Sequence, residues 1–254
     1  MILFDQRACG RSKAENPLQH NTTAHLMQDM ERLRLHLGIS KWVVVGGSWG
    51  GGLGLAYASQ HPSVCWSAVL RGVFLSRPTD LHWFFHDAQR CLPDAWHALA
   101  QHIPSAQRAQ PGPFLIDQIL HAPDAIALPL AQAWQAWENA LTQRCMSPAP
   151  AKLSSQEAQS LLHKYKVQSH YLQHMCFFPA PGLLSQLHPL QDLPIHLLHG
   201  RLDWICLPQA AWEVHQALPH SRLQWIDNAG HNPFEASFVG PMVQAIEDAV
   251  QAAS

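Results

Sequence analysis

The sequence lacks several features that define whole classes of protein. It has six Cys in 254 residues and no C-x-x-C pair, which argues against a disulfide framework. Only 13% of its residues are charged, and the net charge of −2 offers no basic face to a nucleic acid. No apolar run reaches the length of a membrane span, and the first residues, MILFDQR, lack the pattern of a signal peptide. We therefore expect a cytoplasmic protein with no nucleic-acid or membrane partner.

Apolar residues, in contrast, are plentiful. They make up 47% of the chain, whose length suits one large α/β domain with room for an insertion. Helices are predicted at residues 22–37, where Thr22 or Thr23 is the cap and Gly38 the stop, and at 53–58 and 239–249. Short apolar runs predict strands at residues 2–4, 42–45, 67–74, 195–198 and 223–226. Strands that alternate with helices predict a doubly wound, mostly parallel sheet.

The middle of the chain has a different character. Between about residues 77 and 180, Trp, Pro, Gln and Ala increase and β-branched runs disappear. Helical periodicity is clearest at residues 130–138 and 156–171. We predict a helical cap domain at 77–180, inserted into a core formed by residues 1–76 and 181–254. The alternative is an ordinary run of helices within the core.

One stretch, KWVVVGGSWGGGLGLAYA from Lys41 to Ala58, combines a buried strand, a tight glycine-rich turn and a helix. Strand, G-x-S-x-G and helix, with Ser48 at the centre, form the nucleophile elbow of α/β-hydrolases. The tight turn requires small residues two positions before and after the serine. A Walker loop is excluded because no Lys-Ser or Lys-Thr follows the glycines. The remaining alternative is a glycine-rich turn that only packs.

A nucleophilic serine needs a base and an acid that orients the base. In this fold they follow in the order Ser, Asp or Glu, His, on turns after late strands. Asp203 and His231 meet this requirement, and their spacing of 231 − 203 = 28 residues leaves room for a helix and a strand. Asp192 and Asp227 are weaker candidates for the acid. Taken singly, Asp203 could be a loop-capping carboxylate and His231 a surface imidazole, since the chain has 18 His.

Two histidine pairs, His82 with His86 and His170 with His174, have the i, i+4 spacing of metal ligands. Neither has the Glu of a zincin motif or an evident third ligand. We therefore expect no metal site.

With these residues laid out, the chain resembles the prolyl aminopeptidases, also called proline iminopeptidases, over nearly its whole length. The resemblance implies a cofactor-free, cytosolic serine exopeptidase that releases N-terminal proline from peptides, with a helical cap that binds the free amine. It rests on Asp5-Gln6-Arg7, Gly10-Arg11-Ser12, Asn21-Thr22-Thr23, residues 31–34, the elbow, Leu70-Arg71-Gly72-Val73-Phe74, Trp134 to Glu138, His170-Tyr171, residues 200–203 and Ala229-Gly230-His231.

The resemblance also implies roles for single residues. Ser48 would be the nucleophile, Asp203 the acid, His231 the base, and the backbone N–H of Trp49 an oxyanion donor. The substrate-binding residues would be Glu138, which holds the ammonium group of the substrate, together with Gln168 and Arg71.

The sequence departs from the family at several positions. Ala8 stands in place of a Gly, Gly51-Gly52 in place of Ser-Thr, and Gln168 in place of a second amine-binding Glu. The upstream His-Gly-Gly-Pro-Gly segment, which carries an oxyanion loop, has no counterpart here, so low solubility and slow turnover are expected. These departures leave two alternatives to the aminopeptidase: an esterase or amidase with shifted specificity, and a weakly active or inactive relative. The sequence leaves the oligomeric state open.

Overall fold

The structure is a computed structural model that describes residues 1–146 and 152–253. The chain forms two compact units, of which the first combines Met1–Gln28 with Leu81–Phe177 and the second combines Asp29–Asp80 with Phe178–Ser254. The helices α1 (Thr23–His36) and α3 (Pro78–Phe85) begin in one unit and end in the other. The role of residues 77–180 as a cap domain stays a prediction.

The second unit contains a four-stranded parallel sheet. Its strands follow one another in space in chain order, and four of the five predicted strands are thereby confirmed. They are β1 (Trp42–Gly47), β2 (Cys65–Arg71), β3 (Ile195–Gly200) and β4 (Arg222–Ile226). The strand predicted at residues 2–4 is wrong. Ile2, Leu3 and Phe4 are 42%, 81% and 42% exposed and form no ladder, without which an apolar triplet is not a strand.

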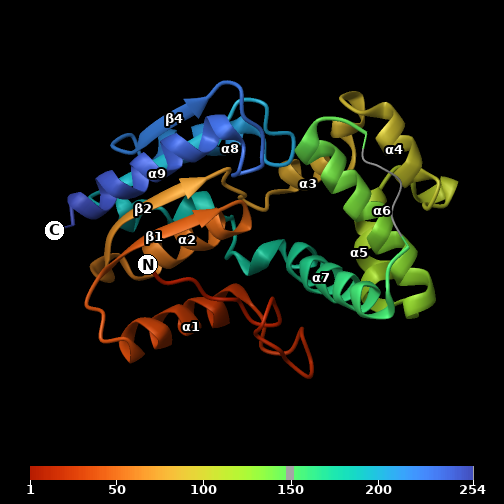
Figure 1. Cartoon of the computed structure of the whole chain (residues 1–254), viewed down its shortest axis with the longest axis horizontal. Helices are drawn as coiled ribbons and strands as arrows, with labels where there is room; N and C mark the ends of the chain where they lie inside the picture. The colour runs from red at the N-terminus through yellow and green to blue at the C-terminus, as the bar shows by residue number, and fades with distance from the viewer. Residues whose placement is uncertain (147–151, 254) are drawn as a thin grey trace. The chain divides into compact units, whose positions relative to one another are not determined.

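Helices cover both faces of this sheet: α2 (Trp49–Gln60), α8 (Pro208–Ala217) and α9 (Ala236–Gln251) (Figure 1). Successive strand residues point to opposite faces. On one face, a Cβ added at Gly54 of α2 would lie 2.9 Å from Leu70 and 3.3 Å from Val44. On the other, Phe238 of α9 belongs to a buried cluster with Val69. The two central strands, β2 and β3, are mostly buried and read as largely apolar runs, whereas β4 at the edge alternates exposed and less exposed residues.

The first unit is helical. Its helices, besides parts of α1 and α3, are α4 (Pro93–Ala100), α5 (Pro111–His121), α6 (Asp124–Gln143) and α7 (Ser155–Gln173). The helices predicted at 130–138 and 156–171 lie within α6 and α7. Buried aromatic rings fill the space between helices, with Trp134 packed on Tyr165 and the Trp137 indole donating to the Phe84 carbonyl at 3.0 Å.

Short 3₁₀ helices complete the chain: η1 (Pro62–Val64), η2 (Asp87–Arg90), η3 (Ser105–Gln107), η4 (Met175–Phe177), η5 (Leu183–Gln186) and η6 (His188–Leu190). The predicted ends of α1 are close to those observed. The Thr22 hydroxyl accepts the N–H of His25 at 3.4 Å, and Gly38 has a φ of 65°, the left-handed geometry that ends a helix. Within the described ranges, no helix is long and apolar enough to cross a membrane.

A buried asparagine links the start of the chain to α7 within the first unit. The Asn21 amide donates to the carbonyl of Pro17 at 2.8 Å, and its own side-chain oxygen accepts the hydroxyl of Tyr171 at 2.8 Å. The His170 ring donates to the Asn21 backbone carbonyl at 3.0 Å. Asn21 and His170-Tyr171, which carry part of the family resemblance, therefore hold each other in place.

Candidate active site

The turn between β1 and α2 holds Ser48 in a strained backbone conformation. Ser48 has φ 58° and ψ −124°, a region that residues other than glycine rarely occupy. Its N–H donates to the Arg71 carbonyl at 3.0 Å, and its carbonyl accepts the N–H of Phe74 at 3.2 Å. Two hydrogen bonds to the chain leaving β2 thus hold the strained serine. Trp49, the predicted oxyanion donor, is the first residue of α2.

The glycines around Ser48 have different reasons to be small. A Cβ at Gly46 would lie 2.2 Å from the Gly50 carbonyl oxygen, so no side chain fits there. A Cβ at Gly50 would meet nothing within 4 Å, and the predicted need for a small residue is therefore wrong at this position. At Gly52 a Cβ would lie 2.4 Å from the Phe74 carbonyl oxygen. This close approach excludes a larger residue at Gly52 in the present backbone.

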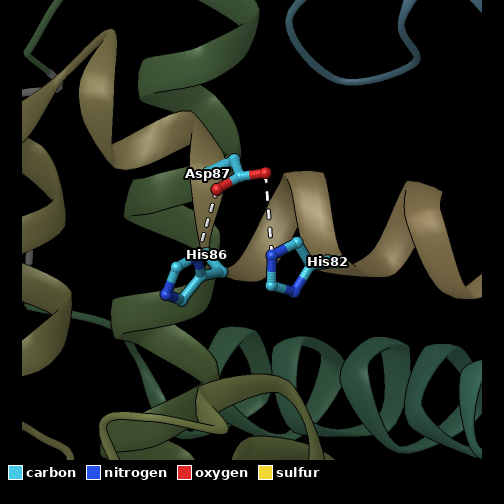
Figure 2. A group of neighbouring side chains, drawn as sticks. All are labelled: His82, His86 and Asp87. Carbon is cyan, nitrogen blue, oxygen red and sulfur yellow. Dashed lines mark hydrogen bonds and ion pairs between the residues drawn. The ribbon is translucent and has the colours of Figure 1, made fainter.

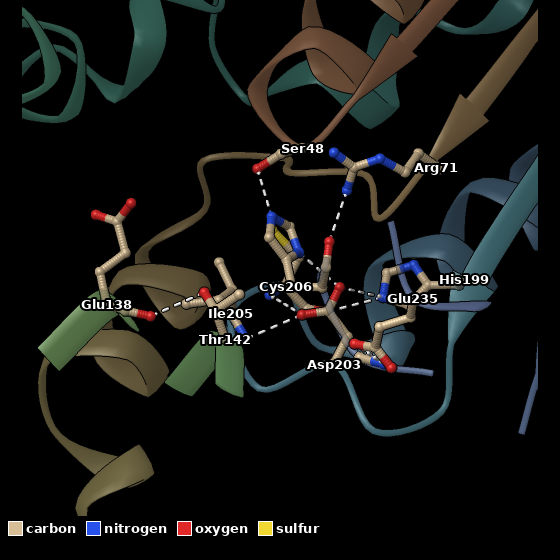
Figure 3. A network of polar contacts seen from close by, with 11 residues as sticks. Ser48, Arg71, Glu138, Thr142, His199, Asp203, Ile205, Cys206 and Glu235 are labelled. Carbon is tan, nitrogen blue, oxygen red and sulfur yellow. Dashed lines mark hydrogen bonds and ion pairs between the residues drawn. The ribbon is translucent and has the colours of Figure 1, made fainter. Parts of the chain in front are cut away.

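Ser48, His231 and Asp203 form a continuous hydrogen-bonded chain. Figure 3 labels Ser48 and Asp203, the two ends of this chain. Nδ1 of His231 lies 2.7 Å from Oδ2 of Asp203, and Nε2 lies 3.0 Å from Oγ of Ser48. An ionised carboxylate only accepts hydrogen bonds, so Nδ1 carries the proton and Nε2 of the neutral ring is an acceptor. The Ser48 hydroxyl therefore donates to Nε2. This is the arrangement that lets an imidazole remove the proton of a serine.

Asp203 is buried and fully hydrogen-bonded. Its side chain is 1% exposed, and its second oxygen, Oδ1, accepts the backbone N–H groups of Ile205 at 2.9 Å and Cys206 at 2.8 Å. Burial opposes ionisation, but the electrostatic attraction and hydrogen bond of the His231 N–H, with the His199 ring and the Cys206 N–H, outweigh it and hold the pKa of Asp203 below its usual value. Asp203 therefore stays ionised in the state that orients His231.

Several neighbours of the triad were not predicted from the sequence. The fully buried His199 ring donates through Nε2 to the Cys206 carbonyl at 2.7 Å, and burial lowers its pKa. Burial also raises the pKa of the Cys206 thiol well above its usual value, so this neighbour of the site stays protonated. The Glu235 carboxylate accepts the N–H of Gly230 at 3.1 Å and so holds the turn that carries His231. Of these neighbours, His199 alone had a signal in the sequence, since it directly follows a predicted strand.

The Arg71 side chain contacts the backbone of His231, the predicted base. Its guanidinium Nη1 donates to the His231 carbonyl at 2.9 Å, and burial lowers its pKa. A Cβ at Gly47 would lie 2.5 Å from the Arg71 Nε, so the glycine makes room for this side chain. The observed contact fixes the loop of His231, whereas the predicted contact of Arg71 with substrate stays a prediction.

In the first unit, Glu138 of α6 lies among three side chains of α7. Its Oε2 accepts the Tyr165 hydroxyl at 3.1 Å and the Gln168 amide at 3.3 Å. The Lys164 ammonium lies 3.5 Å from its Oε1, and the Glu138 side chain is 26% exposed. Burial first, and then the charge of Glu138, raise the pKa of Tyr165, so this hydroxyl remains a neutral donor. The structure thus brings Gln168, a predicted substrate-binding residue, onto Glu138.

The two histidine pairs differ in the structure. His82 and His86 gather with Asp87 into a group of three potential metal ligands, so a candidate third ligand that was not evident from the sequence lies beside this pair. At the other pair, Nε2 of His170 already donates a hydrogen bond to the Asn21 carbonyl.

Comparisons with known proteins agree with this architecture. Residues 1–237 match the family model described as alpha/beta hydrolase fold. The proline iminopeptidase of Xanthomonas citri is 37% identical over 97% of this chain and 79% of its own length. That of Arabidopsis thaliana is 34% identical over 97% of this chain and 66% of its own.

Among solved structures, an alpha/beta fold family hydrolase from Bacillus anthracis str. Sterne superposes with a TM-score of 0.57. The superposition covers 96% of this chain and 80% of that one at 17% identity, which supports the fold alone. The family model and the sequence relatives go further, since the model matches the sequence itself over residues 1–237 and the relatives are 37% and 34% identical over 97% of the chain. The chain therefore belongs to the α/β-hydrolase superfamily and, within it, to the proline iminopeptidase family.

Proposed function

We propose that this protein is a serine exopeptidase that releases N-terminal proline from peptides, with Ser48, His231 and Asp203 as its catalytic triad. The observation that carries the proposal is the hydrogen-bonded chain from Ser48 through His231 to the buried Asp203 in a member of this family. All six Cys are free thiols, which suits the reducing cytoplasm as the place of action.

In the first half of the reaction, the Ser48 oxygen attacks the carbonyl carbon of the substrate's first residue. Nε2 of His231 accepts the hydroxyl proton, and Asp203 stabilises the imidazolium that forms. His231 then donates this proton to the departing amine of the shortened peptide. The C–N bond breaks, and a prolyl ester of Ser48 remains.

In the second half, water replaces the amine. His231 takes a proton from the water, whose oxygen attacks the ester carbonyl, and then returns a proton to the Ser48 oxygen as proline leaves. Both halves pass through a tetrahedral oxyanion. The backbone N–H of Trp49, at the N-terminus of α2, is the proposed donor to this oxyanion, because the helix end favours negative charge.

Glu138 is the proposed anchor for the substrate's ammonium group. The Glu138 side chain is 26% exposed, so a carboxylate there is shielded enough from water to bind a cation more strongly than a fully exposed carboxylate would. Tyr165 and Gln168 hold one of its oxygens, while the half-exposed Lys164 lies 3.5 Å from the other. The substrate ammonium would replace Lys164 at that second oxygen. Gln168 and Arg71 are the further residues proposed to bind substrate.

A second candidate function is an esterase or amidase with a different acyl group. Two observations favour it: the neutral Gln168 beside Glu138, and Lys164, which already neutralises part of that charge. An enzyme of this kind would not need a free amine on its substrate.

Competing chromogenic substrates separate the two functions. Purified protein would be assayed with proline 4-nitroanilide, N-acetylproline 4-nitroanilide and 4-nitrophenyl acetate, beside the Ser48→Ala variant. We expect kcat/KM for free proline anilide to exceed that of the acetylated form strongly, because acetylation removes the ammonium charge. Equal turnover of both anilides, or turnover of the ester alone, would favour the second candidate. A fluorophosphonate probe that fails to label the protein at Ser48 would contradict both.

A further inference from the structure

At the C-terminal end of α3, two imidazoles and one carboxylate converge (Figure 2). His82 lies on α3, His86 directly follows it, and Asp87 begins η2. One ligand atom from each of the three lies within 4.8 Å of the others. Among the residues that the structure describes, this is the one such group of three. It takes no part in the proposed peptidase reaction.

The distances suit a tetrahedral metal ion. Zinc bonds to nitrogen and oxygen of about 2.0–2.2 Å place neighbouring ligand atoms roughly 3.3 Å apart. Nε2 of His82 lies 3.6 Å from Oδ2 of Asp87, and Nδ1 of His86 lies 3.1 Å from its Oδ1. Each contact is thus near the edge length of the tetrahedron, but the two reach different oxygens of Asp87, so the carboxylate must also turn to offer one oxygen to the ion.

The two rings must turn for both to bind one ion. They are stacked, with centroids 4.6 Å apart and planes inclined by 23°, whereas a metal lies in the plane of each imidazole that binds it. The side chains of His82 and His86 are 61% and 37% exposed, so their rings can rotate without disturbing a packed core. Rotation would replace a weak contact between rings with two coordinate bonds.

We propose that His82, His86 and Asp87 form a binding site for a divalent transition-metal ion, best suited to Zn²⁺. Two imidazole nitrogens and one carboxylate oxygen are a ligand set that zinc accepts, and a fourth position is left for water. Hard cations such as Mg²⁺ and Ca²⁺ prefer oxygen ligands and would not use the two nitrogens. The bound ion would tie the end of α3 to η2 and stabilise this corner of the chain.

The Arg90 guanidinium would compete with a bound metal ion for the Asp87 carboxylate. Its Nη2 lies 3.7 Å from Oδ1 of Asp87, and its side chain is 79% exposed. Replacing it with a neutral residue removes a positive charge near the proposed ion without removing a ligand. The Arg90→Gln variant should therefore bind zinc more tightly, an outcome that a purely hydrogen-bonded His–Asp cluster would not produce.

Zinc chloride titration by calorimetry tests the site. Because Cys9 and Cys145 are exposed thiols that also bind zinc, both are changed to Ser in every protein compared. We expect one saturable zinc equivalent in this background. The His82→Ala and Asp87→Asn variants should each lose affinity by more than the about 10- to 100-fold typical of losing an outer-shell partner. Zinc should also raise the melting temperature of the background protein but not of these two variants.

The other histidine pair supplies a matched control. His174→Ala also removes an exposed His with i, i+4 spacing, and it should leave the zinc affinity unchanged. Circular dichroism checks that each variant is folded. Absence of saturable binding to the background protein would overturn the proposal. An equal loss in His174→Ala and His82→Ala, or unchanged binding in both His82→Ala and Asp87→Asn, would overturn it as well.

Discussion

The two carboxylates on which the proposed reaction depends, Asp203 and Glu138, are held in opposite ways. Asp203 is 1% exposed, and its oxygens accept hydrogen bonds from His231 and from two backbone N–H groups. Glu138 is 26% exposed, and the Lys164 ammonium that lies 3.5 Å from it belongs to a side chain that is itself 51% exposed. The partners of Asp203 are fixed, whereas Lys164, the charged partner of Glu138, is exposed enough to be displaced.

This difference follows from what each group is proposed to do. An acid that orients a catalytic base must hold one geometry throughout the cycle, so fixed backbone donors and burial suit it. A carboxylate that receives a substrate cation must be accessible and must exchange its partner at each turnover. The variants below test this contrast, in order of decreasing expected effect.

The largest effect is expected at Ser48, whose proton His231 accepts while Asp203 orients the His231 ring. Ser48→Ala should lower kcat by about 10⁴- to 10⁶-fold, because the triad acts as a unit and no other group takes over its part. The buried thiol of Cys206, whose pKa is raised, does not replace it. The measurement is turnover of proline 4-nitroanilide, with thermal unfolding as a control for the fold. Near-native turnover would remove Ser48 from the mechanism.

Asp203→Asn tests the fixed partner directly. The amide cannot receive the Nδ1–H as an anion does, so the ring can adopt the tautomer in which Nε2 carries the proton and no longer accepts from Ser48. A loss of about 10⁴-fold in kcat is typical of this change. Since the pKa of Asp203 is below its usual value, the wild-type residue is ionised at neutral pH. Rate measurements from pH 6 to 9 should therefore show the deficit throughout, and recovery within this range would contradict the assignment.

Sequence reasoning could single out the three residues of the hydrogen-bonded chain because short stretches of sequence carry the signal for each. The small residues around Ser48, the order of the three residues and the turns after β3 and β4 are all written in short stretches of chain. The partners of Glu138 carry no such signal. Tyr165 and Gln168 lie on α7, about 30 positions away, and only the packing of α6 against α7 brings them to the carboxylate.

The dependence on tertiary packing also explains why the strand predicted at residues 2–4 is wrong and why Asp87 was missed beside His82 and His86. Ile2 to Phe4 has the composition of a strand, but pairing is a property of neighbours and not of the triplet. Asp87 follows His86 directly in sequence, where a helix would point it away from its neighbour. The helix instead ends at Phe85, His86 leaves the helical conformation with φ −136° and ψ −63°, and the Asp87 carboxylate lies beside the two rings.

Glu138→Gln tests the exchangeable partner. A hydrogen bond to a charged group contributes about 1.5–3 kcal/mol, so KM for proline 4-nitroanilide should rise about 10- to 150-fold. The loss should be smaller in kcat than in KM, in contrast to Asp203→Asn. Glu247→Gln removes the same charge from an exposed position on α9 and serves as the control. A loss confined to kcat would place Glu138 with the fixed carboxylates and break the comparison.

Gln168→Glu makes the anchor doubly charged. The new carboxylate would lie beside Glu138, where the Gln168 amide now donates at 3.3 Å, and the two would repel each other in the empty site. A substrate ammonium relieves this repulsion and gains a second charged hydrogen bond, stronger than a neutral one by about 1–1.5 kcal/mol. KM should then fall roughly 5- to 10-fold. A rise in KM would mean that the amide is needed to hold Glu138 in place.

Lys164→Gln should have the smallest effect, and it is the sharpest test of exchangeability. Lys164 lies 3.5 Å from Glu138 and is half exposed, and such pairs contribute about 0.2–1 kcal/mol. If the substrate ammonium must displace Lys164, its removal should lower KM by about 1.5- to 5-fold with kcat unchanged. Lys166→Gln removes the same charge two residues further along α7, where the lysine pairs with Asp124 at 2.9 Å, and should leave KM unchanged. In a Glu138→Gln background, Lys164→Gln should have no effect, because the charge for which the two cations compete is gone. A higher KM in the single Lys164→Gln variant would show that the lysine helps to hold Glu138, and the distinction between a fixed and an exchangeable carboxylate would fail.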